Sequence, residues 1–534
     1  MHSFALWHLN RLGAAWGRQV ADPWAQENLI REDLQLGVEA AFGERPTMRD
    51  INRFFKALGT AFREGQTEPA EFDVTSQRLL EVFRGQRELF RYRLMDELVM
   101  DLLGLLDQGD TLDPLPSHIL VDEYQDLTAG ELRLLQELAK RGTMVIAAGD
   151  DRQSIYRFRE ADELALHRFG KVYGVPADPL TESWRCPQRV CDLAEAIARP
   201  LPPLPDFVRP ALVPRAGRAG AGAIRLLVAR SPTAEARWIA GECLRLIGAG
   251  TRAQDIMVVT ASFYDAVFAS LAEAAGELDG EPFKFYDPRE TDPAAESTAV
   301  RLLGAGARIL VDESDQVAWR TLVWATPQLG PDRLTRILCA SEGDYRRNLE
   351  KVGRTDTVCG RPLAAGRAVL ERFRGQAEVN ARELVGVLTD ALGLTGLDIT
   401  PLAAAESEAS DVTAPANEWA TAVVELSQST LVPPEERPND IPVRTVHGAK
   451  GLEGPVVFLA SAIESCFTGR GGAADGIRRL YVAATRASAS LYISAPRHLR
   501  WTRLGKVAET NVGGLAGLVM DAGTRVGLRV ETVA

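Results

Sequence analysis

Lysine is scarce in this sequence, and the positions of the few lysines exclude a common phosphate-binding loop. The chain has seven lysines among 61 basic residues. A loop of the Gly-Lys-Ser/Thr type (Walker A) needs a lysine between a glycine and a hydroxyl residue. Only Lys171 and Lys506 follow a glycine, and a valine follows each of them. The 534 residues therefore contain no such loop.

Paired cysteines and long apolar runs are missing as well. The six cysteines are scattered without a Cys-x-x-Cys pair, so incidental reduced thiols are a better interpretation than a metal site or disulfides. No apolar run approaches the roughly 18 residues of a membrane span. The N-terminus shows no basic-then-apolar signal peptide. We therefore expect a cytoplasmic protein without membrane association.

An excess of basic charge is also absent. The chain has 61 basic and 73 acidic residues, which gives a net charge of −12. This excludes a histone-like protein that binds nucleic acid through bulk positive charge. It is compatible with a groove in which local arginine and aromatic side chains hold a single strand. The length indicates several domains.

What the sequence does contain is a strand–helix–strand unit in residues 118–159. The apolar run 118–121 has the length and composition of a buried parallel strand. Leucines at helical spacing then predict a helix that ends near Gly142, and residues 144–148 form a second apolar strand. This order is typical of the right-handed crossover in a doubly wound α/β domain. Ligands of such domains lie beyond the carboxyl ends of the strands.

Polar residues that suit nucleotide chemistry follow both expected strands. Asp122 and Glu123 come directly after the first strand, and Gln153 follows the second. One carboxylate could hold Mg²⁺ on a nucleotide while its neighbour orients or deprotonates the attacking water. The glutamine could sense the γ-phosphate. For the acidic dipeptide alone, two solvated residues at the end of a strand are the alternative interpretation.

The linked segments VDEYQD and GDDRQSIYRFR resemble motifs II and III of superfamily 1 DNA helicases of the UvrD/Rep/PcrA group. Four further segments follow the motif order of that family. HSFA near the N-terminus resembles the end of motif Ib, LTESWRCPQRV motif IV, TVHGAKGLEG motif V, and GIRRLYVAATRAS motif VI. Two of these segments depart from the family pattern. Ser183-Trp184-Arg185 stands for Asn-Tyr-Arg, and Gly454 replaces the customary aromatic residue.

The resemblance implies a role for each matching residue, with ATP and Mg²⁺ as cofactors. Asp122 would be the magnesium ligand. The implied catalytic residues are Asp122, Glu123, Gln153, Arg185 and Arg486. The implied nucleotide contacts are Asp122, Gln153, Arg185, Glu453 (to the ribose) and Arg486. The implied contacts to single-stranded DNA are His2, Phe4, Tyr156, Phe158, Arg159 and His447. Helical spacing from Arg479 through Ala483 also predicts that Arg486 lies on a helix.

The fold implied by the resemblance is α/β, with two RecA-like domains of the P-loop NTPase type. Each would have a parallel sheet and a helical insertion. The expected division is 1–11 and 101–178 for the first domain with insertion 12–100, 179–300 and 439–500 for the second with insertion 301–438, and a tail at 501–534. The glutamine motif, Walker A loop and motif Ia of the family precede its motif Ib. We therefore expect the first RecA-like domain to be incomplete at its N-terminus.

The activity implied is that of an ATP-dependent helicase that moves 3′ to 5′ on single-stranded DNA and unwinds duplex DNA. DNA repair or recombination is the expected setting. Because a Walker A loop is missing, we expect the 534 residues to be inactive in ATP hydrolysis by themselves. A non-catalytic DNA-binding or scaffolding remnant of such a helicase is the main alternative. An unrelated nucleotide-dependent enzyme is disfavoured by the segments that resemble motifs III and V.

Overall fold

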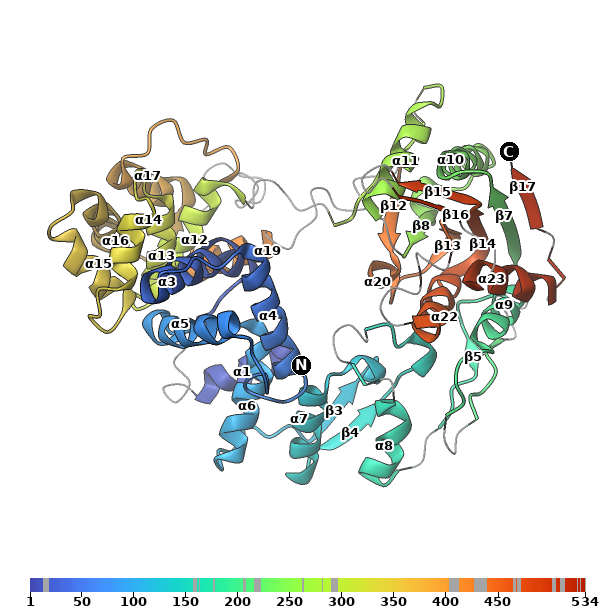
Figure 1. Ribbon diagram of the computed structural model, residues 1–534, viewed down its shortest axis with the longest axis horizontal. Helices are drawn as coiled ribbons and strands as arrows, with labels where there is room; N and C mark the ends of the chain where they lie inside the picture. Colours follow the sequence, from blue (N-terminus) through green and yellow to red (C-terminus); the bar gives the residue numbers. More distant parts are fainter. Residues whose placement is uncertain are drawn as a thin grey trace. The chain divides into compact units, whose positions relative to one another are not determined.

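The chain is described by a computed structural model that divides it into two compact units (Figure 1). Unit 1 comprises Met1–Ser117, Ala129–Thr143 and Thr291–Leu431, and unit 2 comprises His118–Thr128, Met144–Glu290 and Val432–Ala534. The structure describes residues 1–12, 19–156, 161–162, 164–175, 178–204, 208–215, 222–261, 264–280, 282–289, 296–402, 413–426, 439–463, 467, 472–501, 506–509, 514–525, 527–528 and 530–533.

Unit 1 is built from amphipathic helices. Helix α4 shows why they form. Thr47 caps it by accepting from the backbone N–H of Asp50, whose carboxylate accepts from the Thr47 N–H in return. The main helices of the unit are α1 (His2–Leu12), α3 (Arg31–Phe42), α4 (Met48–Arg63), α5 (Val74–Phe90), α6 (Leu98–Asp107), α7 (Ala129–Lys140), α12 (Thr298–Val311), α13 (Gln316–Ala325), α14 (Pro331–Leu338), α15 (Tyr345–Gly353), α16 (Thr357–Phe373), α17 (Ala381–Leu392) and α19 (Ala416–Leu426).

A buried ion pair joins two helices of unit 1 that are far apart in the sequence. Arg320 on α13 donates to Asp33 on α3 through Nε and Nη2, at 3.0 and 2.8 Å from Oδ1. The two side chains are 2% and 1% exposed. Burial raises the pKa of the Asp33 carboxyl, and Arg320 opposes that rise. The helical segments that the sequence assigns to two separate insertions therefore belong to one body.

Unit 2 contains a seven-stranded sheet in which every neighbouring pair is parallel. The strand order is β17-β7-β14-β13-β8-β12-β9. The strands are β7 (Ala223–Ala229), β8 (Ile256–Thr260), β9 (Lys284–Tyr286), β12 (Asp440–Thr445), β13 (Gly454–Leu459), β14 (Ala487–Pro496) and β17 (Val530–Val533). Parallel strands are buried on both faces, which explains their continuous apolar runs.

Helices cover both faces of this sheet (Figure 1). Along β13, Val457 and Leu459 join the core on one face, while Val456 and Phe458 join the core on the other. The first core includes residues of α9 (Gln188–Ala198), α22 (Gly472–Ala484) and α23 (Gly514–Arg525). The second includes residues of α10 (Pro232–Gly248) and α11 (Tyr264–Gly276). The expected α/β class with parallel sheets is thereby confirmed.

A second, smaller sheet in unit 2 pairs β3 (His118–Val121) with β4 (Met144–Ala147) in parallel. Both strands occur where the sequence predicts them. Alternate side chains on one face remain in solvent, with Leu120 78% and Ile146 49% exposed. This sheet has two strands within the described residues, and its apolar face is far less covered than that of the seven-stranded sheet.

The residues after 500 contribute to the large sheet, although the sequence division treats them as a tail. Strand β17 pairs with β7 at the sheet edge, and α23 lies against α9. Four residues of edge strand give too weak a sequence pattern to be recognised without the partner strand. No helix in the described part of the chain has both the length and the hydropathy needed to cross a membrane.

Candidate functional site

The first element of the site is the sharp turn at the end of β3. Glu123 has a φ of 50°, in the left-handed region that residues other than glycine seldom adopt. The exposed Asp122 stabilises this turn, because its Oδ1 accepts from the Glu123 N–H at 2.8 Å. Strained backbone of this kind concentrates at functional positions. The two adjacent acids consequently project from one turn, as their sequence position predicts.

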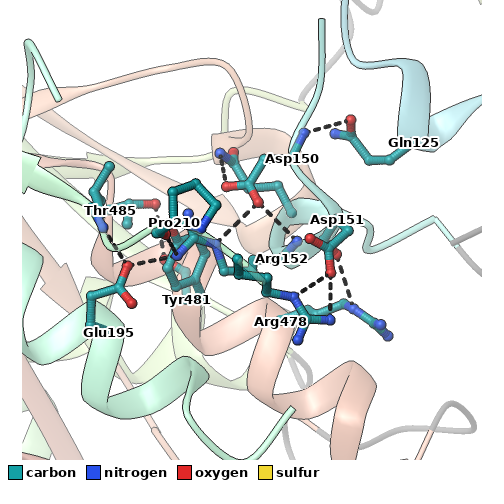
Figure 2. A network of polar contacts seen from close by, with 12 residues as sticks. Gln125, Asp150, Asp151, Arg152, Glu195, Pro210, Arg478, Tyr481 and Thr485 are labelled. Carbon is teal, nitrogen blue, oxygen red and sulfur yellow. Dashed lines mark hydrogen bonds and ion pairs between the residues drawn. The ribbon is translucent and has the colours of Figure 1, made fainter. Parts of the chain in front are cut away.

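Gln125 ties this turn to the end of β4. Its side chain is fully buried, and its Nε2 donates to Glu123 Oε2 at 2.5 Å. Its Oε1 accepts from the Asp150 N–H at 3.0 Å, and Figure 2 shows this contact. A Cβ at position 149 would lie 2.3 Å from the same Oε1, so Gly149 provides the space for the amide. Gln125 therefore fixes the Glu123 carboxylate relative to the second strand.

Asp150 connects Gln125 to Gln153, which lies in the short helix η5 (Asp151–Gln153). Gln153 donates from Nε2 to Asp150 Oδ2 at 3.1 Å and accepts at Oε1 from Arg486 Nη2 at 3.2 Å. The other carboxylate oxygen of Asp150 accepts from the backbone N–H and Nε of Arg152. Both ends of the Gln153 amide are thus assigned a partner, which fixes its orientation.

Arg486 is held at a helix end instead of on the helix, so the expectation of a helical Arg486 is wrong. Helix α22 ends at Ala484. The Thr485 hydroxyl donates to the Tyr481 and Val482 carbonyls in the last turn, and the chain then enters β14. The Arg486 Nε still reaches back to the Val482 carbonyl at 2.8 Å. Burial, and then the nearby Arg185 charge, lower the pKa of Arg486 to about 10.

The two residues expected to bind opposite ends of a nucleotide bind each other in this structure. Arg185 Nε lies 2.6 Å from Glu453 Oε2, and its Nη1 donates to the Thr485 carbonyl at 3.3 Å. Arg185 follows the short strand β5 (Glu182–Ser183), and Glu453 directly precedes β13. A ligand that uses both side chains must first separate this ion pair.

Lys450 is a member of the site that the sequence prediction did not include. Its Nζ binds Asp126 Oδ2, donates to the Gln153 carbonyl at 2.9 Å and lies 3.4 Å from Glu123 Oε2. The side chain is only 5% exposed. One signal was available in the sequence: Lys450 lies in the turn that resembles motif V, and lysine is otherwise rare in this chain.

Tyr156 lies beside two side chains of the motif V turn. The His447 and Tyr156 ring centroids are 5.4 Å apart, and Lys450 Nζ is 5.2 Å from the Tyr156 centroid. His447 Nε2 lies 3.2 Å from the Ile155 carbonyl, which can only accept, so Nε2 carries the proton. Burial, and then the Arg479 and Lys450 charges, lower the pKa of His447. The neutral imidazole consequently holds the backbone just before Tyr156.

Of the remaining expected DNA contacts, two belong to unit 1 and two lie outside the described residues. His2 and Phe4 lie on α1 in unit 1. His2 Nε2 is 4.0 Å from Asp96 Oδ1, and the Phe4 ring packs edge-on against His8 at 4.5 Å. Phe158 and Arg159 lie outside the described residues.

The acids of the site fit a magnesium ion that arrives with a nucleotide. Mg²⁺ keeps several waters and usually takes one or two carboxylates together with phosphate oxygens. The exposed carboxylate of Asp122 at the strand end suits that arrangement. Within the described residues, no group of three or more His, Cys, Asp or Glu side chains could hold a metal ion. The donor set therefore fits a nucleotide-borne metal and not a dedicated protein cage.

Two family models match parts of the chain that contain most of the site residues. Residues 1–174 match the UvrD/REP helicase N-terminal domain, and residues 411–498 match the UvrD-like helicase C-terminal domain. Together with the parallel sheets and the site described above, these matches support a superfamily 1 helicase of the UvrD/Rep/PcrA type.

Individual relatives agree with this family. The chain is 25% identical over 483 residues to the ATP-dependent DNA helicase srs2 of Schizosaccharomyces pombe, which covers 81% of this chain and 52% of that protein. It is 22% identical over 531 residues to the ATP-dependent DNA helicase PcrA of Staphylococcus epidermidis, covering 91% of this chain and 70% of the relative. PcrA of Staphylococcus aureus gives the same identity and coverage over 532 residues. The chain thus spans about half the length of the yeast relative.

Proposed function

We propose that this chain carries the ATP-hydrolysis switch of a DNA helicase that moves 3′ to 5′ on single-stranded DNA and unwinds duplex DNA. The observation that carries the proposal is the continuous hydrogen-bonded path from the Glu123 carboxylate to the Arg486 guanidinium, through Gln125, Asp150 and Gln153. This path joins the candidate catalytic acid to the candidate phosphate-binding arginine. Family membership supports the direction of movement and the unwinding.

The side chains on this path have complementary chemical roles. Glu123 orients the attacking water and accepts its proton, while the Gln125 amide keeps the carboxylate in place. Gln153 is placed to sense the γ-phosphate because its amide already bridges Asp150 and Arg486. Arg486 supplies a permanent positive charge to the oxygens that gain charge in the transition state. Mg²⁺ held with the nucleotide by Asp122 would neutralise charge on the phosphate oxygens.

The Arg185–Glu453 ion pair supports a site that changes when nucleotide binds. We assign Arg185 to the γ-phosphate and Glu453 to the ribose. Because the two side chains are joined at 2.6 Å here, nucleotide binding exchanges one ion pair for two separate contacts. Such an exchange gives the site two discrete arrangements, which a nucleotide switch requires.

The contacts around Tyr156 support a connection between the nucleotide and a DNA strand. We assign base stacking to Tyr156, an interaction worth about 1–3 kcal/mol per base and independent of sequence. Lys450 contacts Glu123 and the Gln153 carbonyl, and it also lies beside the Tyr156 ring. A change at the γ-phosphate therefore reaches the stacking residue through one side chain.

The 534 residues contain no Walker A loop. We propose that turnover needs a phosphate-cradling loop in addition to the residues described. The same absence supports the second candidate, a non-catalytic DNA-binding protein derived from a helicase. The two candidates differ in whether the switch residues still work once such a loop is supplied.

The test is to add the loop. In an extended chain, a strand followed by a glycine-rich Gly-Lys-Thr loop precedes residue 1 and the sequence is otherwise unchanged. We expect this extended chain to hydrolyse ATP in a DNA-stimulated manner and Glu123→Gln to abolish the hydrolysis. DNA binding with no hydrolysis in any extended version would favour the non-catalytic candidate.

A further inference from the structure

We infer that a pocket beside Arg152 in unit 2 is a binding site for a phosphate group, separate from the candidate nucleotide site. The pocket has a volume of about 440 Å³. Small-molecule sites typically have volumes of about 300–1,000 Å³. Its lining shares no residue with the path from Glu123 to Arg486. The lining residues are Arg152, Glu195, Ala196, Ala198, Arg199 and Arg209.

The charged lining favours an anion. The lining holds three arginines and one glutamate. Glu195, Asp150 and Asp151 balance the charges of Arg152 and Arg209, and the Arg199 charge has no such partner within the described residues. The glutamate is already occupied, because Glu195 Oε1 accepts from Arg152 Nη1 at 2.6 Å and from the Leu212 N–H at 2.8 Å. The carboxylate therefore opposes an incoming anion less than a free one would.

Two of the arginines are fixed in direction before any ligand arrives. Arg152 is held by Glu195 and by Asp150, as Figure 2 shows. Its guanidinium carbon also lies 4.9 Å from the centroid of the Tyr481 ring. Arg209 is held by Asp151, with Nε 2.8 Å from Oδ2. Side chains anchored in this way lose little conformational entropy on binding a ligand. They form a rigid wall of N–H donors whose charge is balanced by the three carboxylates.

The third arginine supplies donors that are still available. Arg199 is exposed at the end of α9, and among the described residues its guanidinium makes no hydrogen bond or ion pair. A planar guanidinium can bind two oxygens of a phosphate at once. The pocket thus combines the guanidinium of Arg199, which has no partner within the described residues, with two fixed guanidinium groups, and donors of this kind recognise a phosphate group. The source of that group is either a small free phosphate or the backbone of a nucleic-acid strand.

The position of the pocket connects it to the switch residues. Asp150 accepts from Arg152 at one carboxylate oxygen and from Gln153 at the other. A phosphate bound by Arg152 would therefore weaken the contact between Arg152 and Asp150, and Asp150 is the residue that orients Gln153. Binding at this pocket would adjust the switch without contact to the nucleotide itself.

The 534-residue chain itself is suitable for the test. Binding of pyrophosphate is measured by titration calorimetry, and binding of a labelled single-stranded oligonucleotide by fluorescence anisotropy. Each titration is repeated on Arg199→Glu and on Arg189→Glu, a matched control on the same helix whose exposed side chain is not in the pocket lining. Because the Arg199 side chain is exposed and unpartnered within the described residues, its replacement should leave the fold intact.

We expect Arg199→Glu to weaken binding about tenfold or more, as loss of a charge-assisted hydrogen bond predicts. Arg189→Glu should stay within about twofold of the unchanged chain. A selective loss for pyrophosphate assigns the pocket to a small phosphate, and a selective loss for the oligonucleotide assigns it to strand backbone. Equal behaviour of the two variants with both probes, or no binding of either probe, would overturn the proposal.

Discussion

The side-chain amide of Gln125 donates to the Glu123 carboxylate at 2.5 Å, and it does so from a fully buried position. A carboxylate that orients the attacking water must itself be held in one orientation, because free rotation would lose the productive geometry. The partner amide removes that freedom while leaving the second carboxylate oxygen available. Substitution of Gln125 should therefore affect the chemistry of Glu123 as well as packing.

We predict that the 534-residue chain, purified alone, hydrolyses ATP no faster than background. Its 534 residues offer neither the backbone donors of a glycine-rich phosphate loop nor the lysine within it. Positioning is most of phosphoryl-transfer catalysis, so the deficit should be several orders of magnitude. Phosphate release with and without single-stranded DNA measures it. Strong DNA-stimulated turnover by this chain would contradict our account of the site.

Different substitutions at the two acids should have different effects in the extended chain. Glu123→Gln should retain nucleotide binding and lose turnover, because glutamine cannot accept a proton. Asp122→Ala should weaken binding of the magnesium–nucleotide complex, because a metal ligand is lost. Titration with a fluorescent nucleotide and a turnover assay separate the two results. Identical behaviour of the two variants would refute this division of roles.

Removal of the Lys450 ammonium should destabilise unit 2. Lys450→Met keeps most of the length of the side chain but leaves Asp126 and the Gln153 carbonyl without this donor. We expect a loss of about 2 kcal/mol in unfolding free energy, typical of hydrogen bonds to charged groups. Urea denaturation measures it. Lys171→Met, at an exposed lysine of the same unit, is the control and should change stability by less than about 0.5 kcal/mol.

His447 should make stability depend on pH. Its folded-state pKa is lowered, so below the ordinary value of 6.5 the unfolded chain binds the proton more readily than the folded chain. The contribution of His447 is therefore complete above pH 6.5 and declines as pH falls below that value. His447→Gln should remove this part of the pH dependence, which is measured as the difference between the two denaturation profiles. Parallel profiles from pH 7.5 to 5.5 would show that His447 does not titrate in this way.

The two sheets of unit 2 should differ in local stability. Val145–Ala147 belongs to a two-stranded sheet with one exposed apolar face, whereas Val456–Leu459 has paired strands on both sides. Opening the small sheet exposes little new apolar surface, so its amides should exchange at a much lower free energy. Hydrogen exchange followed by mass spectrometry makes the comparison. Equal protection of the two segments would mean that the small sheet is stabilised by contacts we have not described.

Sequence patterns predicted the strands well and the cross-connections poorly. The strands ending at Val121 and Ala147 could be predicted because each is a short apolar run followed by polar residues. The exposure of one face of each strand could not be predicted from those runs. Gln125 could not be singled out, since its role depends on the backbone N–H of Asp150, which lies in the turn after a different strand. The Arg486 helix was overextended because the helical spacing continues to Arg486, two residues beyond Ala484, where the helix ends as the Thr485 hydroxyl donates to the Tyr481 and Val482 carbonyls. Hydrogen bonds between distant segments leave no periodic pattern in the sequence.

The Asp33–Arg320 ion pair has a consequence for the order in which the protein is made. The two residues are 287 positions apart, so a ribosome that adds roughly 5–20 residues per second leaves the acid without its partner for about 15–60 s. During that interval the face of α3 that Arg320 will cover is still open to solvent. Unit 1 therefore completes its core late in synthesis, and its earliest helices are the ones that most need protection from aggregation.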